Sequence, residues 1–480
     1  KMLFNSLDFA VFLPIVFILY WLLNSRLNAQ NALIVISSYI FYGWWDWRFL
    51  LLILFSTIVD YTVGICLTKT DILKNRKRLL ICSLVTNLGL LGLFKYYNFF
   101  LDNFSQAFSF FGYELQISTL NIVLPVGISF YTFQTLSYTI DVYRNKIEPT
   151  TDFVSFAAFV SFFPQLVAGP IERATNLLPQ FYKPRYFQYR NAVDGLRQIL
   201  WGLFKKMVIA DNCAIYANMI FNNSEDYSGS TLALGAVFFA FQIYGDFSGY
   251  SDIAIGTSRL FGFDLKQNFA FPYFSRDIAE FWRRWHISLS TWFRDYLYIP
   301  LGGSRTNTIR NVFIIFLVSG FWHGANWTFI IWGLLNALYF LPLLLSKKNR
   351  IHTNVIAEHS YLPSIKELLQ VMITFSITTI AWVFFRAESV AHALQFLRAM
   401  FSIDLYSLPV YSIRKLIYPT SILIVFFVII EWLGRRHKYA IENILFKLNK
   451  PLRWLFYTII IFLIGMYMQT EETPFIYFQF

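Results

Sequence analysis

Two short stretches of the chain each place a histidine among strongly apolar and aromatic residues. One runs from Ser319 to Trp327 (Ser-Gly-Phe-Trp-His-Gly-Ala-Asn-Trp) and contains His323, and the other runs from Phe281 to Ser290 and contains His286. The chain has only six histidines in 480 residues. An ionisable side chain at membrane depth is costly unless it is paired or used in function. Both histidines are therefore candidate functional residues.

The neighbours of His323 are suited to a dry, tightly packed site. They are Ser319, Gly320, Trp322, Gly324, Ala325, Asn326 and Trp327. Small residues let another backbone or a ligand approach closely, tryptophans exclude water, and an asparagine can orient an imidazole. Burial disfavours the imidazolium ion, so we expect a neutral ring near pH 7. Such a ring can remove a proton from a hydroxyl as a general base, which typically contributes ~10²–10⁴-fold to the rate. A histidine that only packs helices together is an equally compatible interpretation.

The second histidine falls in a segment that fits one helix over 277–300. At ~100° per residue, the apolar side chains fall on one stripe, which consists of Ile278, Trp282, Trp285, Leu289, Trp292 and Tyr296. The charged residues Glu280, Arg283, Arg284, Arg294 and Asp295 occupy the remaining surface. So many charges cannot face lipid tails, so the helix lies in an interface or lines an enclosed cavity. His286 sits at the border of the stripe, with Arg283 one turn before it and Ser290 one turn after it. Composition alone favours a simpler role, in which His286 bonds a neighbouring carbonyl.

The composition is that of a multi-pass membrane protein. The chain is 56% hydrophobic and only 14% charged, whereas soluble domains have about 25% charged residues. The net charge of +12 comes from short basic clusters between apolar segments, which fits cytoplasmic loops facing anionic lipids and anionic substrates better than nucleic acid. The three cysteines, Cys66, Cys82 and Cys213, lack CxxC spacing and indicate neither a disulfide framework nor a metal site.

Apolar segments predict about eleven membrane helices with some re-entrant pieces, and hence an all-α fold. They lie at 7–23, 32–43, 48–66, 79–101, 118–140, 152–168, 198–221, 231–261, 311–344, 367–386, 417–433 and 453–470. The stretch 32–66 is interrupted at Gly43 to Arg48, where we expect a break or a turn. The stretch 311–344 is long for one span and lies between basic residues at both ends, so it is expected to enter the membrane and return, with His323 at the turn.

Loop charges predict which side of the membrane each loop faces. The loop from Lys69 to Arg78 holds five basic residues and is expected in the cytoplasm, whereas 102–117 and 222–230 hold no lysine or arginine and are expected outside. The tail after Glu472 would then also lie outside. We expect its aromatic end, Phe475 to Phe480, to be a docking strand for a partner.

Two further stretches carry polar groups or breaks at membrane depth. Asp246 and Asp252, with Ser248 and Ser251, lie in an otherwise apolar span, and we favour structural pairing of these aspartates with arginines over catalysis. The stretch from Phe162 to Arg173 contains two prolines and a glycine that should break a helix. The motifs GxSxG, HxxEH, GxGxxG and the P-loop are all missing, which argues against common soluble-enzyme chemistries.

Several of these motifs together closely resemble the membrane-bound O-acyltransferase family, and within it the branch of the alginate O-acetyltransferase membrane subunit. The segments that carry the resemblance are Leu124–Gln134 (Leu-Pro-Val-Gly-Ile-Ser-Phe-Tyr-Thr-Phe-Gln), Phe163–Pro170, Phe281–Gly303 and Phe321–Trp327. The resemblance covers nearly the whole chain, and the string 281–303 is highly specific.

The resemblance implies one membrane domain over 1–480, built as a helical ring around a tunnel. In the family, the histidine matching His323 is taken as catalytic and the one matching His286 as its tunnel partner. Trp282, Arg283, Trp285, Ser290, Asn326, Trp327 and Asp246 are further candidates for the tunnel or substrate site. The expected donor is cytoplasmic acetyl-CoA, with no permanently bound cofactor and no metal.

The function expected from this resemblance is O-acetylation of an extracytoplasmic, alginate-like polysaccharide. The protein would lie in the bacterial inner membrane and pass the acetyl group to an extracytoplasmic hydrolase-like acetyltransferase. Alginate, bacterial cellulose, another exopolysaccharide and peptidoglycan all stay open as acceptors. Two alternatives are a teichoic acid D-alanyl transferase that uses a carrier-protein thioester, and a non-enzymatic polymer-export channel.

Overall fold

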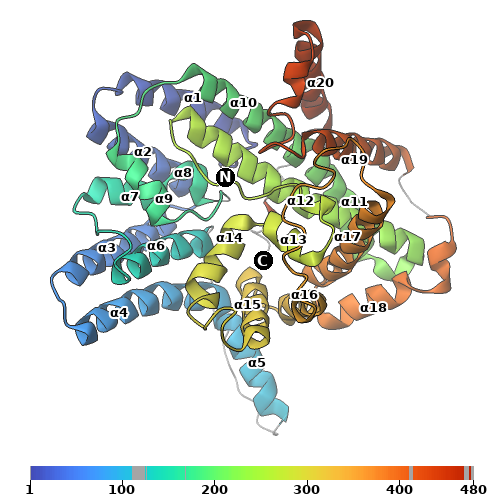
Figure 1. Ribbon diagram of the computed structural model, residues 1–480, viewed down its shortest axis with the longest axis horizontal. Helices are drawn as coiled ribbons and strands as arrows, with labels where there is room; N and C mark the ends of the chain where they lie inside the picture. Colours follow the sequence, from blue (N-terminus) through green and yellow to red (C-terminus); the bar gives the residue numbers. More distant parts are fainter. Residues whose placement is uncertain are drawn as a thin grey trace. The chain divides into compact units, whose positions relative to one another are not determined.

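The computed structural model describes residues 2–110, 125, 127–167, 169–409, 414–469 and 475–476. Figure 1 shows that these residues are built from helices and their connections, and none of the described residues lies in a β-strand. The predicted all-α fold is therefore confirmed.

Seven helical stretches in the described part of the chain are long and apolar enough to cross a membrane. They are Arg48–Thr68, Leu73–Phe110, Gly229–Leu260, Trp327–Leu345, Ile365–Arg386, Ile417–Gly434 and Lys450–Tyr467. Shorter apolar helical stretches cover Leu7–Leu22, Phe153–Leu166 and Thr308–His323. The chain is thus a multi-pass membrane protein. The count of about eleven spans stays a prediction, because part of the segment 118–140 lies outside the described residues.

The helices group into two compact units. Unit 1 comprises Lys1–Ala192 and Ser258–Leu265, and unit 2 comprises Val193–Thr257 and Lys266–Phe480. The two units share α10 (Tyr189–Leu203) and α12 (Gly229–Leu260), because each of these helices contains residues of both. A single domain over 1–480 stays a prediction.

Unit 1 contains nine α-helices among its described residues. They are α1 (Leu7–Leu22), α2 (Leu27–Gly43), α3 (Arg48–Thr68), α4 (Leu73–Leu91), α5 (Tyr97–Phe110), α6 (Ile128–Tyr143), α7 (Phe153–Ser161), α8 (Phe163–Leu166) and α9 (Ala174–Leu177). The expected interruption at Gly43 to Arg48 is confirmed as the turn between α2 and α3. The expected break in 162–173 is also confirmed, because α7 and α8 are separate short helices there.

A buried carboxylate helps to hold α3, α4 and α6 together. Asp60 on α3 is fully buried and accepts hydrogen bonds from Ser83 Oγ, from Asn87 Nδ2 (2.9 Å) and from Thr139 Oγ1 (3.0 Å). Three donors compensate the loss of water around this side chain. Nearby, Gly127 has φ 72°, and a Cβ atom there would lie 2.8 Å from the carbonyl oxygen of Leu166. Glycine at position 127 thus lets the start of α6 approach the end of α8 closely.

Unit 2 is built around the long helix α12. Its other α-helices are α11 (Asp211–Asn222), α13 (Ile278–Arg284), α14 (Ile287–Phe293), α15 (Thr308–His323), α16 (Trp327–Leu345), α17 (Ile365–Arg386), α18 (Val390–Met400), α19 (Arg414–Gly434) and α20 (Lys450–Tyr467). Between α10 and α11, residues Phe204–Ala210 form the π-helical segment η3. A Cβ atom at Gly249 would lie 2.8 Å from the carbonyl oxygen of Gly202, so glycine allows α10 to approach α12 closely.

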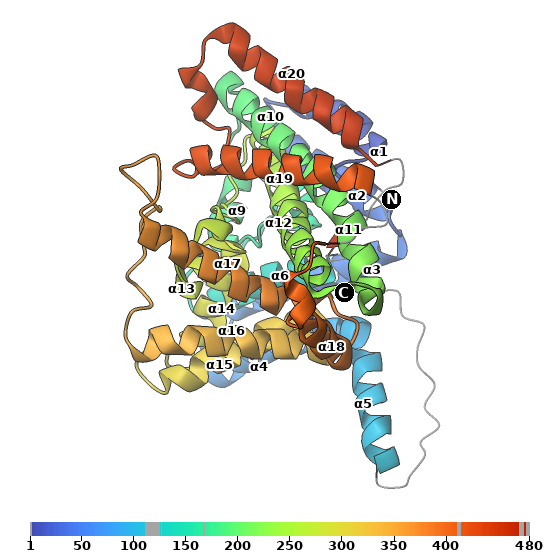
Figure 2. The same cartoon turned by 90° about the vertical axis from the view of Figure 1, so that its right-hand side faces the viewer.

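The stretch 311–344 forms a helical hairpin, as expected. Figure 2 shows α15 and α16 side by side, and the turn between them follows His323. Added Cβ atoms at Gly320 and Gly333 would each clash with a backbone carbonyl of the partner helix, those of Phe329 and Phe316 respectively. Small residues thus let the two helices pack closely, as is common between membrane helices.

Candidate active site

The segment 277–300 is not one continuous helix. The helix α13 ends at Arg284, α14 begins at Ile287, and the last turn, Arg294–Tyr298, is π-helical. His286 lies in the break and has left-handed backbone angles, φ 42° and ψ 55°, which are uncommon for a residue with a Cβ atom. The predicted single stripe of apolar side chains is therefore wrong. Unusual backbone conformations of this kind cluster at functional sites.

The break is stabilised by backbone hydrogen bonds to residues 268–270. The backbone N–H of Ala270 donates to the carbonyl of Arg284 (2.9 Å), and that of Ile287 donates to the carbonyl of Asn268 (2.8 Å). These bonds satisfy backbone groups that a continuous helix would have paired internally. Tertiary contacts with residues 268–270 thus determine where α13 ends and α14 begins.

The side chain of Asn268 orients the ring of His286. Its Oδ1 accepts hydrogen bonds from the Ser288 backbone N–H (3.2 Å) and hydroxyl (2.8 Å), and it lies 3.1 Å from Nδ1 of His286. Since a backbone N–H can only donate, the shared atom is the amide oxygen, and Nδ1 of His286 must carry a proton. Nδ2 of Asn268 donates to Ser251 Oγ (3.0 Å), in agreement with this assignment.

The remaining ring nitrogen of His286 is left as the basic one. His286 is 1% exposed, and burial lowers its pKa to about 3, so the ring is neutral at pH 7. With the proton on Nδ1, Nε2 has a lone pair. This buried Nε2 has no hydrogen-bond partner among the described residues. It can therefore accept a proton or a hydrogen bond from a bound substrate.

His323 is the last residue of α15 and is 3% exposed. Aromatic rings surround it, with centroid distances of 5.0 Å to Trp322, 5.1 Å to Trp332 and 5.3 Å to Phe385. The chain then turns at Gly324, where a Cβ atom would clash with the ring of Phe329. The ring of His323 thus points into the protein and not into lipid.

The two histidine motifs meet at one tryptophan. The ring of Trp322 lies 6.2 Å from His286 and 5.0 Å from His323, measured between ring centroids. Trp332 continues the aromatic wall to Trp382 (5.6 Å), which in turn contacts Trp285 (5.0 Å). We call these six side chains, namely Trp285, His286, Trp322, His323, Trp332 and Trp382, the histidine cluster.

The other candidates in 281–290 lie around this cluster. Trp285 is 1% exposed and belongs to it. Trp282 contacts Trp332 (5.6 Å between ring centroids) and forms its next layer. Arg283 is exposed and donates to the carbonyls of Asn349 (2.9 Å) and His352 (2.7 Å), so it anchors the loop between α16 and α17.

The backbone N–H of Ser290 donates to the carbonyl of His286 (3.0 Å) and so starts α14. Its side-chain hydroxyl contacts the carbonyl of Trp285 (3.4 Å).

Asn326 and Trp327 have different surroundings from those expected of tunnel residues. The Oδ1 of Asn326 caps α16 by accepting from the Thr328 N–H (3.0 Å), and its Nδ2 donates to the carbonyl of Glu388 (3.0 Å). Asn326 thus begins a helix. Trp327 is 53% exposed, which argues against a place in the buried cluster.

The buried aspartates of α12 pair with lysines, and the expected pairing with arginines is wrong. Lys206 Nζ lies 2.8 Å from both Asp246 and Asp211, and Lys205 Nζ lies 2.5 Å from Asp252. Both lysines belong to the π-helical segment η3, whose wider turn places the consecutive residues Lys205 and Lys206 against α12. Structural pairing of these aspartates is thus confirmed.

This pairing makes a prediction about stability. Replacing Asp246 by alanine leaves the buried Lys206 with one carboxylate instead of two, and it should destabilise the protein by about 3 kcal/mol. The measurement is thermal unfolding of the purified protein in detergent. Alanine at the exposed Asp226 is the control and should leave the unfolding temperature unchanged. Equal unfolding temperatures for both variants would contradict the structural role of the pair.

Phe475 and Ile476 of the carboxy-terminal tail are buried, and the docking strand expected over Phe475 to Phe480 stays a prediction. The Ile476 N–H donates to Asp246 Oδ2 (2.6 Å), and the ring of Phe475 lies 4.6 Å from Tyr250 and 5.6 Å from Phe247. Phe247 also contacts His286, at 4.5 Å between ring centroids. The rest of the tail, residues 477–480, lies outside the described residues.

Three residues of the site were missed by sequence reasoning. Asn268, Trp332 and Trp382 lie outside the two histidine motifs, and Asn268 is a lone asparagine in a loop without any recognisable pattern. A signal existed only for the tryptophans, which fall within apolar spans. Within the described residues, no group of three or more histidine, cysteine, aspartate or glutamate side chains is placed to hold a metal ion.

Comparison with known proteins gives a consistent set of relatives. The model of the membrane-bound O-acyltransferase family matches residues 40–385. The chain is 41% identical to the probable alginate O-acetylase AlgI of Pseudomonas aeruginosa, over 85% of this chain and 76% of that protein. It is 37% identical to the peptidoglycan O-acetyltransferase of Helicobacter pylori, over 85% and 81% of the two chains. It is 30% identical to the teichoic acid D-alanyltransferase of Streptococcus thermophilus, over 46% of this chain and 57% of that protein.

Proposed function

Since this chain belongs to the membrane-bound O-acyltransferase family, we propose that it transfers an acetyl group from cytoplasmic acetyl-CoA towards a hydroxyl of an extracytoplasmic polysaccharide. The observation that carries the proposal is the meeting of two buried histidines at Trp322. Both come from motifs that the sequence singled out, and a site with two imidazoles and excluded water suits acyl transfer to a hydroxyl.

In the proposed reaction, His323 removes the proton from the attacking hydroxyl of the acceptor. The hydroxyl oxygen forms a bond to the thioester carbonyl carbon, the carbon–sulfur bond breaks, and the thiolate of CoA leaves and takes up a proton. His286, held by Asn268 with its Nε2 lone pair available, orients the acceptor or relays this proton. The aromatic wall around both rings excludes water, which would otherwise hydrolyse the thioester.

The proposed setting is the inner membrane of a bacterium, with the donor in the cytoplasm and the acceptor outside. The basic loops expected on the cytoplasmic side would attract the phosphates of CoA. A hydrolase-like acetyltransferase on the outer side would receive the acetyl group and pass it to the polymer. The names of the relatives, alginate O-acetylase and peptidoglycan O-acetyltransferase, support a polysaccharide as the acceptor.

The donor is tested directly with the purified protein in lipid nanodiscs. We expect the protein to consume radiolabelled acetyl-CoA and release free CoA when the polysaccharide acceptor is added. A D-alanyl carrier protein should not be consumed under the same conditions. Consumption of the D-alanyl carrier protein without consumption of acetyl-CoA would refute the proposed donor.

D-alanyl transfer is the second candidate, because a teichoic acid D-alanyltransferase is among the relatives. That relative matches less than half of this chain, whereas the alginate O-acetylase of Pseudomonas aeruginosa matches 85% at higher identity. The difference favours the acetyl donor.

A further inference from the structure

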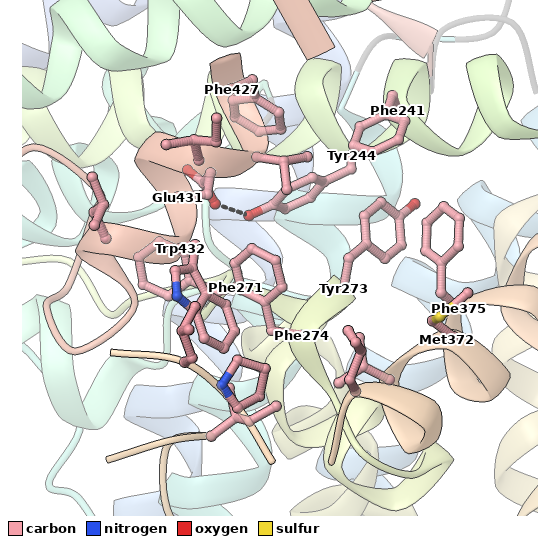
Figure 3. Close-up of a pocket in the computed structure, with 18 residues that line it drawn as sticks. Phe241, Tyr244, Phe271, Tyr273, Phe274, Met372, Phe375, Phe427, Glu431 and Trp432 are labelled. Atoms are coloured by element: carbon pink, nitrogen blue, oxygen red, sulfur yellow. Dashed lines mark hydrogen bonds between the residues drawn. The ribbon is translucent and has the colours of Figure 1, made fainter. Parts of the chain in front are cut away.

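An apolar cavity of about 470 Å³ lies within unit 2, and neither His286 nor His323 lines it (Figure 3). It is enclosed by α12, α17 and α19 and by the connections around 271–274 and 356–363. Its aromatic and aliphatic wall includes Phe241 of α12, Met372 and Phe375 of α17, and Phe427 and Trp432 of α19. Its volume falls in the range of known ligand pockets.

The wall of the cavity offers almost nothing to a polar ligand. Glu431 is the carboxylate among its lining residues, but Tyr244 Oη donates to one oxygen (2.6 Å) and Trp201 Nε1 to the other (3.0 Å). Figure 3 shows the hydrogen bond between Tyr244 and Glu431 as a dashed line. A ligand with amides, such as the pantetheine arm of CoA, would lose hydrogen bonds to water on entry. A hydrocarbon chain would lose no hydrogen bonds on entering the cavity.

The cavity reaches the outer face of membrane-spanning helices. Met372 on α17 and Ile429 on α19 line it and are 58% and 51% exposed. Both helices are long and apolar enough to cross the membrane. Exposed apolar side chains on such helices face lipid tails, so the cavity opens sideways into the hydrocarbon of the bilayer.

One end of the cavity has the features of a membrane–water interface. The indole N–H of Trp432 donates to the carbonyl of Tyr361 (2.8 Å), and the guanidinium of Arg435 stacks over the Trp432 ring at 4.0 Å. Arg436 is exposed beside them and donates to the carbonyls of Ala357 and Ser360. Tryptophan and arginine at a helix end are typical of the depth at which lipid phosphates lie.

We propose that this cavity binds an acyl chain of a membrane phospholipid, with the lipid phosphate near Arg436. The hydrocarbon enters between α17 and α19, and the aromatic lining replaces the contacts that the chain makes in the bilayer. Tyr244 and Tyr273 line the cavity and also contact Trp285, at 6.1 Å and 6.0 Å between ring centroids. The bound chain therefore lies one aromatic layer behind the histidine cluster. This binding does not depend on which acyl donor the protein uses.

The test uses full-length protein in nanodiscs that contain phosphatidylglycerol with a photoreactive diazirine in one acyl chain. After irradiation, mass spectrometry should locate crosslinks on the cavity-lining residues of α17 and α19. Val371→Trp fills the cavity and should reduce these crosslinks by at least about tenfold. Ile373→Trp is the matched control, because Ile373 lies on the same helix, does not line the cavity and is 62% exposed. It should leave the crosslinks unchanged.

A second substitution examines the phosphate end. Arg436→Glu should weaken crosslinking by phosphatidylglycerol more than crosslinking by phosphatidylcholine, because only the first lipid has a net negative charge. If Val371→Trp is recovered poorly, Met372→Trp serves in its place. Three results would overturn the proposal: crosslinks spread evenly over all exposed helices, crosslinks equally strong in the filled and control variants, or protection of the cavity by acetyl-CoA.

Discussion

Replacing His323 by alanine should abolish polymer acetylation while the protein still inserts in the membrane. His323 ends α15 inside an aromatic enclosure, so removing the imidazole removes the proposed base without changing a surface that faces lipid. General-base catalysis typically contributes ~10²–10⁴-fold, and the acetylation rate should fall by that amount. The measurement is the ester content of the polysaccharide from cells that carry the variant as their only copy, together with acetyl-CoA turnover by the purified protein.

The matched control is alanine at His359, which lies exposed in the loop before α17. This variant should retain full activity, and both variants should accumulate in the membrane to the same level. His323→Gln keeps a polar side chain of similar size and should be as inactive as the alanine variant, because an amide cannot take up the proton. Acetylation that persists without His323 would defeat the catalytic assignment and favour a transport role.

The hairpin around His323 could be predicted from the sequence because its signals are local. The apolar stretch 311–344 exceeds the length of one span, basic residues flank both ends, and Gly324 interrupts the helix at the centre. Each of these observations constrains the chain independently of the rest of the fold. The interruption at Gly43 to Arg48 and the breaks in 162–173 were predictable for the same reason. Glycine, proline and charged residues interrupt an apolar helix at their own position in the sequence.

The break at His286 could not be predicted because no local signal marks it. Neither glycine nor proline occurs between Asp277 and Ile299, and the apolar residues repeat with helical spacing. The helix ends because residues 268–270, separate in sequence, bind the backbone of Arg284 and Ile287. Tertiary contacts of this kind override local helix propensity. The same holds for Lys205 and Lys206, whose pairing with α12 depends on a π-helical turn that periodicity does not reveal.

Residue type alone also misplaced the role of Asn326. Its position three residues after His323 suggested an orienting partner, but its side chain caps α16, a use for which asparagine is equally well suited. The orienting asparagine is Asn268, which precedes His286 by 18 residues. Separation along the sequence thus did not indicate which asparagine side chain forms a hydrogen bond with which histidine ring.

Asn268 should be a positioning residue for His286, and its substitution should reduce kcat more than it changes KM. Leucine has a similar volume but cannot accept the hydrogen bond that His286 Nδ1–H donates, so the ring loses its fixed tautomer and orientation. We expect kcat to fall by about 10²-fold, towards the lower limit of what a proton-transfer group contributes. Ser288→Ala is the control: it removes one hydroxyl donor to Asn268 and keeps the backbone bond, and its activity should change little.

The pH profile separates positioning from a merely structural effect. In the wild-type protein, the pKa of His286 is lowered to about 3 by burial, so His286 stays neutral from pH 5 to 8 and contributes no acidic limb there. Asn268→Asp keeps an acceptor for Nδ1–H and adds a negative charge, which stabilises the imidazolium and raises the pKa of His286. Below that raised pKa the ring binds a proton, Nε2 loses its lone pair, and kcat should fall as the pH is lowered. A pH profile of the aspartate variant that matches the wild type, or full activity in the leucine variant, would show that His286 acts without this hydrogen bond.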